Sequence, residues 1–266
     1  MKGIKWTREE TLIAFTLYCK IPFGKINKNN PEIIEVAKIL GRTESAVAMK
    51  MCNIASYDPI QQERGIKGLK NGSKIEQEVW KEFNENSNKL ILEAEKLLFK
   101  LKNKEIKNES ELNLAYNSFD EIEYKEAILG GERERVINER IGQDFFRKVV
   151  LSSYNNCCCM TGISISELLI ASHIKPWKVS NNEDEKTNPR NGLCLNALHD
   201  KAFDRGLITI DKNYKIIVSS KLKEKKVDDI TKLWIAQSEG KKIILPNRFI
   251  PNKHFIEYHN DMIFKP

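Results

Sequence analysis

Hydrophobic residues recur at helical spacing through much of the first 155 positions, and shorter apolar runs follow. The first helical pattern is the apolar run from Leu12 to Tyr18. It comes after the letters WTREE, in which Thr7 is placed to cap a helix and Glu10 to complete a capping box. The pattern therefore predicts a helix that begins close to Thr7.

Two further helices are expected before residue 60. Pro31 suits the first turn of a helix over 32–40, and Gly41 breaks that helix. Thr43 then caps a second helix over 44–54. Two helices joined by Gly-Arg-Thr form a helix-turn-helix candidate, although the same spacing also occurs in ordinary helical bundles.

The second helix of this pair supplies candidate contacts with DNA. We expect Lys50 and Asn53 to point outward from it and Arg42 to lie close to the turn. These side-chain types reach phosphates and base edges. They predict a DNA-recognition role for the N-terminal part.

The middle of the chain reads as a connector. Residues 73–102 have the periodicity of one or two amphipathic helices, and residues 102–117 are charged and poor in apolar side chains, as in an exposed linker. Residues 136–154 form another amphipathic helical pattern. The predicted division is a helical recognition domain at 1–70, a helical connector and linker at 71–130, and a C-terminal domain at 131–266.

The second half begins with a predicted hairpin. Residues 168–174 are apolar enough for a strand, and Pro176 cannot extend its ladder, so His173 falls where the strand ends. A polar stretch at 178–190 has loop composition. Asn191 and the glycine that follows it then open a second apolar run.

A short helix is expected directly after the hairpin, from Ala197 to Arg205, with Gly206 placed to end it. Asp200 and Asp204 are four residues apart and therefore share one helical face. Two more short strands, over 207–211 and 215–219, follow the helix.

These polar side chains suit the hydrolysis of a phosphodiester. The reaction needs a base of near-neutral pKa, which His173 can supply, and a divalent cation, which helix carboxylates can hold. The amide of Asn191 can donate and accept at once, and so can brace the loop beside the histidine. Oxygen ligands favour Mg²⁺ or Mn²⁺, whereas an imidazole ligand makes Zn²⁺ or Ni²⁺ more competitive.

The segments SHIKPW, NGL and LHDxAFDxGLIT resemble those of the HNH endonucleases, whose ββα-metal fold is a hairpin with a helix packed across it. The resemblance implies that His173 is the general base, that Asn191 braces the loop, and that Asp200 is a metal ligand. Asp204 and His199 are further candidate ligands. Many members carry an acidic residue or a histidine just before the base as a second metal ligand, and this chain has Ser172 there.

A weaker resemblance extends over most of the chain. Segments at 22–24, 41–50 and 58–68, and the lead-in GQDFFRKVVLSSY, are similar to parts of restriction-type HNH proteins. The implied architecture is α+β: an N-terminal helical, helix-turn-helix-like domain, a helical connector and a C-terminal ββα-metal domain.

Composition and charge restrict the partners. No C-x-x-C pair is present, so zinc knuckles like those that brace some HNH proteins have no ligand set. No apolar run approaches twenty residues, which argues against a membrane partner, and adjacent thiols without a signal peptide predict a cytoplasmic protein. The formal charge of +7 is concentrated at both ends, as expected for modules that touch a polyanion. The candidate DNA contacts are Arg42, Lys50, Asn53, Lys175, Arg190 and Arg205.

The sequence thus predicts a metal-dependent endonuclease that acts on double-stranded DNA, of the restriction or phage-defence kind. One site cuts one strand, so a double-strand cut requires a homodimer or two successive nicks. Two alternatives stay open: a DNA-binding regulator whose HNH unit has lost catalysis, suggested by Ser172, and a nuclease for structured RNA.

Overall fold

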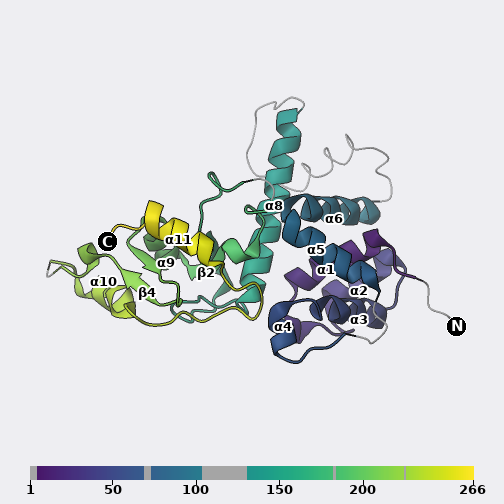
Figure 1. Cartoon of the computed structure of the whole chain (residues 1–266), viewed down its shortest axis with the longest axis horizontal. Coiled ribbons are helices and arrows are strands. Elements are labelled where there is room, and N and C mark those ends of the chain that lie inside the picture. The colour runs from purple at the N-terminus through teal and green to yellow at the C-terminus, as the bar shows by residue number, and fades with distance from the viewer. Residues whose placement is uncertain (1–4, 69–72, 104–130, 182–183, 225) are drawn as a thin grey trace. The chain divides into compact units, whose positions relative to one another are not determined.

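Helices form the N-terminal part of the protein, and a small mixed region forms the C-terminal part (Figure 1). The computed structural model describes residues 5–68, 73–103, 131–181, 184–224 and 226–266. The predicted linker at 102–117 lies outside them from residue 104 onward. The chain divides into unit 1, residues 1–145 with 182–187, and unit 2, residues 146–181 with 188–266. The fold class is α+β, as predicted.

The elements of the described part follow one another along the chain, with short 3-10 turns between several of them. The helices and strands are α1 (Arg8–Lys20), α2 (Pro31–Leu40), α3 (Glu44–Ala55), α4 (Pro59–Glu63), α5 (Lys74–Glu85), α6 (Ser87–Lys102), α8 (Gly131–Ser153), β1 (Leu169–His173), β2 (Gly192–Asn196), α9 (Ala197–Asp204), β3 (Ile208–Ile210), β4 (Ile216–Val218), α10 (Asp229–Trp234) and α11 (Lys253–Met262).

Helix α1 is the central helix of unit 1. It begins with the predicted capping box, in which the Thr7 hydroxyl accepts from the Glu10 amide at 3.2 Å and the Glu10 carboxylate accepts from the Thr7 amide at 2.9 Å. Every side chain from Leu12 to Cys19 is buried, and α3, α5 and α6 pack around the helix. A helix that is apolar on all faces needs this cover from its neighbours.

The predicted boundaries of the next two helices are confirmed. Pro31 occupies the first turn of α2, and Gly41 ends it in the left-handed conformation at φ 64°. Thr43 caps α3 by accepting from the Ala46 amide at 3.2 Å. The short range of these signals explains why the sequence alone predicted them.

The outward orientation expected for Lys50 and Asn53 is wrong, because both side chains are buried. Lys50 lies on the same face of α3 as Val47 and Met51, and this face packs into unit 1. Its ammonium lies 2.6 Å from a carboxylate oxygen of Glu76, which is also buried. A buried charge requires such a partner, and this one comes from a distant helix, α5. Helical spacing within α3 could not reveal it.

Arg42 also has a structural role in unit 1. Its guanidinium donates to the Glu10 carboxylate at 2.7 Å and to the Lys5 carbonyl at 2.8 Å. It also lies over the Trp6 ring, 4.9 Å from the centroid. These contacts tie the turn between α2 and α3 to the start of α1.

The connector pattern at 73–102 forms two helices rather than one. Asn86 separates α5 from α6, and its side chain caps α6 by accepting from the Lys89 amide at 3.0 Å. The rings of Trp80 and Phe83 on α5 lie 5.5 and 5.0 Å from the ring of Phe15 on α1. Both helices therefore pack against α1 within unit 1.

In unit 2, β1 and β2 form the predicted hairpin, and His173 ends β1 opposite Gly192. Side chains alternate between the two faces of a strand. Ser172 and Leu193 therefore lie on one face of the hairpin, and His173 and Cys194 lie on the other. Helix α9 follows β2 directly and packs against both strands.

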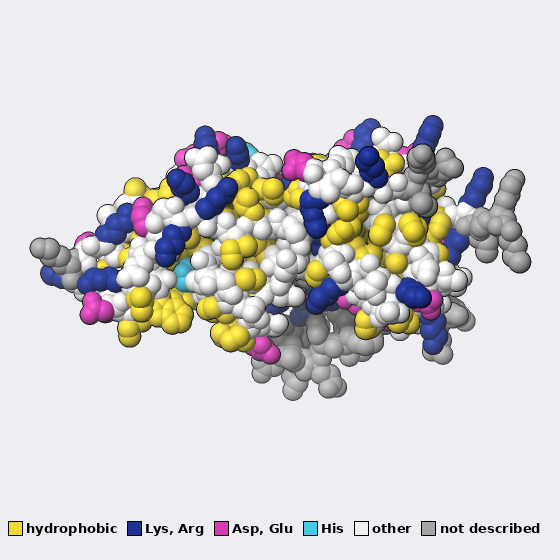
Figure 2. Space-filling view, turned by 90° about the horizontal axis from the view of Figure 1, so that it is seen from below, with side chains coloured by type: hydrophobic (Ala, Val, Ile, Leu, Met, Phe, Trp, Pro, Cys, Tyr) yellow, Lys and Arg dark blue, Asp and Glu magenta, His cyan; other side chains and the backbone are white. Residues whose placement is uncertain are grey.

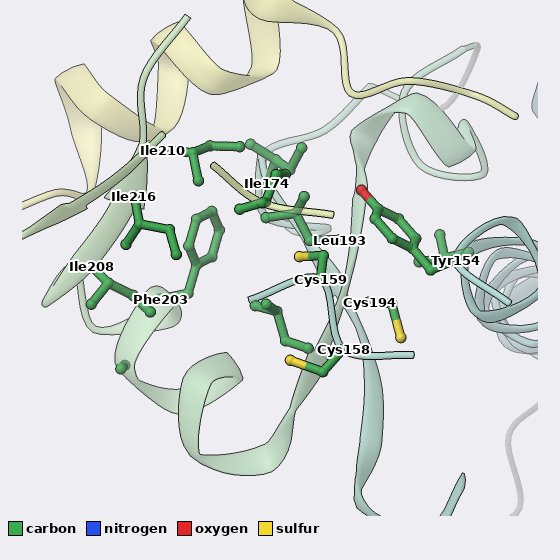
Figure 3. Close-up of a cluster of buried hydrophobic side chains, with 14 of the residues drawn as sticks. Tyr154, Cys158, Cys159, Ile174, Leu193, Cys194, Phe203, Ile208, Ile210 and Ile216 are labelled. Atoms are coloured by element: carbon green, nitrogen blue, oxygen red, sulfur yellow. The ribbon is translucent and has the colours of Figure 1, made fainter. Parts of the chain in front are cut away.

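The core of unit 2 surrounds the ring of Phe203 on α9. Figure 3 shows this ring facing Ile208, Ile210 and Ile216 of the second hairpin, which β3 and β4 form. Cys194 lies on the side of β2 away from Phe203 (Figure 3). The hairpin of β1 and β2 is therefore held by apolar packing on both of its faces.

Gly206 joins α9 to the C-terminal end of the chain. Its φ is 68°, and a Cβ atom there would lie 2.0 Å from the carbonyl oxygen of Ile263. The Lys265 amide donates to the Gly206 carbonyl at 2.9 Å. Only glycine permits both the backbone conformation and this close approach.

Helix α11 was not predicted, and it buries His259 in unit 2. The His259 ring stacks on Phe203 with a centroid distance of 3.7 Å, and its Nε2 lies 3.1 Å from the Phe203 carbonyl. Burial lowers the pKa of His259 to about 4, although the bond to this carbonyl opposes the shift. His254, by contrast, is exposed.

Acid is expected to destabilise unit 2 through His259. The folded-state pKa of about 4 lies below the ordinary value of 6.5, so stability is full above pH 6.5 and falls as the pH drops toward 4. The expected loss is about 3 kcal/mol in the free energy of unfolding at pH 4. Urea unfolding at several pH values measures it. A His259→Phe variant should have a flatter profile between pH 6.5 and 4, and an unchanged profile would contradict this assignment.

No helix in the described part of the chain has the length and apolar character needed to cross a membrane.

Candidate active site

His173 lies at the end of β1 between two aromatic rings. The Phe146 ring stacks on it, with centroids 3.6 Å apart and planes 14° apart. The Trp177 ring meets it at 84° with a centroid distance of 5.5 Å. The side chain is only partly buried, so the imidazole retains access to solvent. Sequence reasoning missed both rings, although Trp177 belongs to the SHIKPW segment.

Asn191 braces the loop that follows His173. Its side-chain oxygen accepts from the Lys175 amide at 2.8 Å, and its side-chain nitrogen donates to the Lys175 carbonyl at 3.0 Å. Its backbone carbonyl accepts from the Ile174 amide at 2.9 Å. Asn191 is fully buried. These bonds have the geometry expected of a bracing amide, and they fix the backbone next to the histidine.

Removing the Asn191 amide is expected to loosen this loop. Asn191→Ala removes the acceptor of the Lys175 amide and one donor to the Lys175 carbonyl, to which the Ser180 hydroxyl also donates at 3.0 Å. The change should lower the free energy of unfolding by about 1–3 kcal/mol. Urea unfolding of the variant measures the loss. The same substitution at the exposed Asn213 should change stability little. Equal effects at both positions would contradict the bracing role.

Asp200 and Asp204 lie one helical turn apart on α9. The helix begins at Asn196, whose side chain accepts from the amides of Leu198 and His199 at 3.1 Å. Desolvation raises the pKa of the Asp200 carboxyl, with the neighbouring Ser172 opposing the shift. Desolvation and the charge of Asp200 both raise the pKa of Asp204. The two carboxylates therefore repel each other at close range.

Ser172 lies beside this carboxylate pair. It is 3% exposed, and among the described residues its hydroxyl oxygen has no hydrogen-bond partner of good geometry. The hydroxyl nevertheless lies near enough to Asp200 to influence the pKa of that carboxyl. The Ser172 hydroxyl is therefore a further candidate oxygen donor beside Asp200.

His199 occupies a different face of α9. It is fully buried, like Ala202 and Phe203 on the same helix, and its Nδ1 lies 3.1 Å from the Asn196 side-chain oxygen. Desolvation lowers its pKa, with the nearby Trp234 backbone opposing the shift. His199 thus lies in the core, whereas Asp200 and Asp204 reach the surface.

The donor set fits a hard divalent cation. In the described part of the chain, no three His, Cys, Asp or Glu side chains are grouped as a ready-made metal cluster. Asp200, Asp204 and the Ser172 hydroxyl provide oxygen donors, and a cation would relieve the repulsion between the carboxylates. Mg²⁺ and Mn²⁺ accept such incomplete oxygen sets because water completes their coordination.

Two of the predicted DNA-binding cations lie over aromatic rings. The Lys175 ammonium is 5.3 Å from the centroid of the Tyr258 ring, and the Arg190 guanidinium is 5.7 Å from that of Phe249. Both rings come from the C-terminal part of the chain, which the sequence did not connect with the site. Arg205 is exposed just after α9. Figure 2 shows Lys and Arg side chains spread over the displayed face of unit 2.

Three consecutive cysteines, Cys157 to Cys159, lie in the turn before β1. All six cysteines are free, and Cys158 and Cys159 are buried. The Cys159 amide donates to the Cys194 carbonyl at 2.8 Å, and the Asn196 side chain donates to Thr161 at 3.0 Å. These bonds hold the turn against β2.

A comparison with protein families matches residues 158–211 to the HNH endonucleases. Residues 158–211 therefore form an HNH endonuclease domain, a kind of domain that implies nuclease activity. The matched segment includes β1, β2, α9 and the four residues His173, Asn191, Asp200 and Asp204. No curated protein matches the sequence significantly.

Proposed function

We propose that this protein is a metal-dependent DNA endonuclease. The observation that carries the proposal is the placement, within one HNH domain, of a solvent-accessible His173, its bracing Asn191, and a carboxylate pair on the adjoining helix. The family supplies the reaction class, hydrolysis of a phosphodiester. DNA as the substrate rests on the basic residues around the site and on the resemblance to restriction-type proteins.

In the proposed mechanism His173 takes a proton from a water molecule, which then attacks phosphorus. Asn191 holds the backbone that follows His173, and the rings of Phe146 and Trp177 border the imidazole. Asp200 and Asp204, with the Ser172 hydroxyl, would hold the divalent cation. When bound, this cation supplies charge neutralisation at the leaving 3′ oxygen. The expected product carries a 5′ phosphate.

Lys175, Arg190 and Arg205 are the proposed phosphate contacts of the nuclease unit. The aromatic rings beneath Lys175 and Arg190 limit the freedom of these long side chains, so less conformational entropy is lost when they bind a phosphate. In unit 1 the outward side chains of α3 include Ser45 and Met49, whereas Lys50 and Asn53 are buried. Recognition of DNA by unit 1 would therefore use residues other than Lys50 and Asn53.

The biological role that we propose is restriction or defence against phage DNA in the cytoplasm. Cleavage of both strands would require two copies of the single site or two successive nicks. The competing regulator hypothesis draws on Ser172, which replaces a ligand found in many HNH proteins. It predicts DNA binding without cleavage.

Side-by-side substrates test the proposal. Purified protein is incubated with supercoiled plasmid, phage DNA with and without base modification, and structured RNA, each with Mg²⁺, Mn²⁺ or EDTA. We expect cutting of DNA that EDTA abolishes. Cutting of RNA alone would replace DNA with RNA as the substrate. DNA binding without cutting in any metal would support the regulator.

A further inference from the structure

The residue that covers the His173 ring comes from outside the HNH segment. Phe146 lies on α8, twelve residues before the segment at 158–211 begins. Its ring and the imidazole are nearly parallel, 14° apart, with 3.6 Å between centroids. At this separation the phenyl ring covers one face of the imidazole.

Gly192 makes this stack possible. It lies opposite His173 in the hairpin, and a Cβ atom built on it would be 2.9 Å from Cζ of Phe146 and 2.4 Å from a methyl carbon of Val150. Its φ of −128° is ordinary extended backbone, so any residue could adopt the conformation. The position requires a residue without a side chain, because Phe146 and Val150 of α8 occupy the space that a Cβ atom would need.

Phe146 is itself held rigidly. It is 2% exposed and belongs to the same buried cluster as Val150, Leu193 and Cys194. Because the core holds the Phe146 ring in place, this ring can in turn restrict the His173 ring that stacks on it. The contact leaves the imidazole partly exposed, with Trp177 meeting it at 84°.

We propose that Phe146 is a positioning residue, which sets the plane of the His173 ring and so directs its nitrogen toward the attacking water. This inference rests on the proposed function, in which His173 is the base. A general base acts only when its lone pair is aligned with the proton that it removes. Helix α8 is thus a working part of the nuclease site.

The test combines spectra with kinetics. Phe146→Leu removes the flat ring but keeps an apolar side chain, and Phe146→Met is a second variant of similar bulk. The matched control is Phe255→Leu, the same change at another buried aromatic of the same cluster. Proton and carbon NMR spectra of the imidazoles are simple because the chain has four histidines, and a His173→Ala variant assigns the relevant signal.

In the wild-type protein the phenyl ring current should shift the His173 ring protons upfield. Both Phe146 variants should move these signals toward the position of an unstacked histidine, and should lower kcat roughly tenfold to a hundredfold with KM unchanged. Phe255→Leu should do neither. Together these results would support the positioning role.

Other outcomes overturn it. A His173 signal that is the same in the wild type and in both Phe146 variants would show that the two rings do not stack in solution. A shifted signal with an unchanged kcat would show that the stack does not position the base. If His173→Ala cuts as fast as the wild type, the proposed function loses its base and the positioning role falls with it, while the spectra still report the ring contact independently.

Discussion

Replacing His173 with alanine is expected to slow phosphodiester cleavage by roughly 10²- to 10⁴-fold, the usual contribution of a general base. The imidazole is the partly exposed group at the end of β1, and the Asn191 bonds and the Phe146 ring fix its surroundings. DNA affinity should change little, because the proposed phosphate contacts lie on other residues. Single-turnover cleavage of a labelled duplex, with binding measured in EDTA, separates the two effects.

The control for this substitution is His254→Ala. His254 is exposed on α11 and lies outside the proposed site, so its removal should leave the cleavage rate unchanged. Equal losses in both variants would point to a general effect of losing a histidine. A His173→Ala protein with wild-type activity would remove His173 from the mechanism.

Replacing Asp200 with asparagine is expected to weaken metal binding by at least roughly tenfold. Two opposite unit charges about 4 Å apart attract each other by about 1 kcal/mol in bulk water and about 4 kcal/mol near a protein surface. The attraction to a divalent cation is larger. Asparagine keeps the shape and one oxygen donor but removes the charge. The concentration of Mg²⁺ or Mn²⁺ needed for half-maximal cleavage measures the change.

The same substitution makes a second, opposite prediction for the metal-free protein. Desolvation disfavours the charged form of Asp200, and that charge in turn raises the pKa of Asp204. Asp200→Asn should therefore raise the melting temperature in EDTA and reduce the stabilisation gained on adding metal. Asp261→Asn, at an exposed aspartate of α11, should do neither. A wild-type response to metal in Asp200→Asn would place the cation elsewhere.

The elements that the sequence predicted best carry their signals within a few residues. The capping box of Thr7 and Glu10 and the left-handed Gly41 act over one helical turn. The end of β1 at His173 follows from the proline three residues later. Such features depend on local backbone chemistry, so no knowledge of the rest of the fold is needed.

The features that the sequence missed depend on partners far along the chain. Lys50 was expected to point outward because α3 itself offers no partner for a buried charge. Its partner, Glu76, lies on another helix, α5. The Phe146 ring reaches His173 only because α8 passes over Gly192. Charge and hydrophobicity along one helix identify its faces, but they do not identify what packs against each face.

The sequence predicted only part of the carboxylate site, because spacing along a helix does not reveal which face is buried. The spacing of Asp200 and Asp204 placed them together, and the structure keeps them on the outer part of α9. His199 is adjacent in sequence, yet one residue along a helix turns its side chain by about 100°. That rotation places it in the core, where it contacts Asn196. Adjacent candidates can be separated only when the buried face of the helix is known.

The central claim is that the HNH domain of this protein is an active metal-dependent nuclease. The most direct test is to incubate the wild-type protein with an end-labelled DNA duplex in Mg²⁺, Mn²⁺ or EDTA and to determine the chemistry of the new ends. We expect fragments with 5′ phosphate and 3′ hydroxyl ends in the presence of metal and none in EDTA. Intact DNA in every metal, or cleavage that persists in EDTA, would contradict the account.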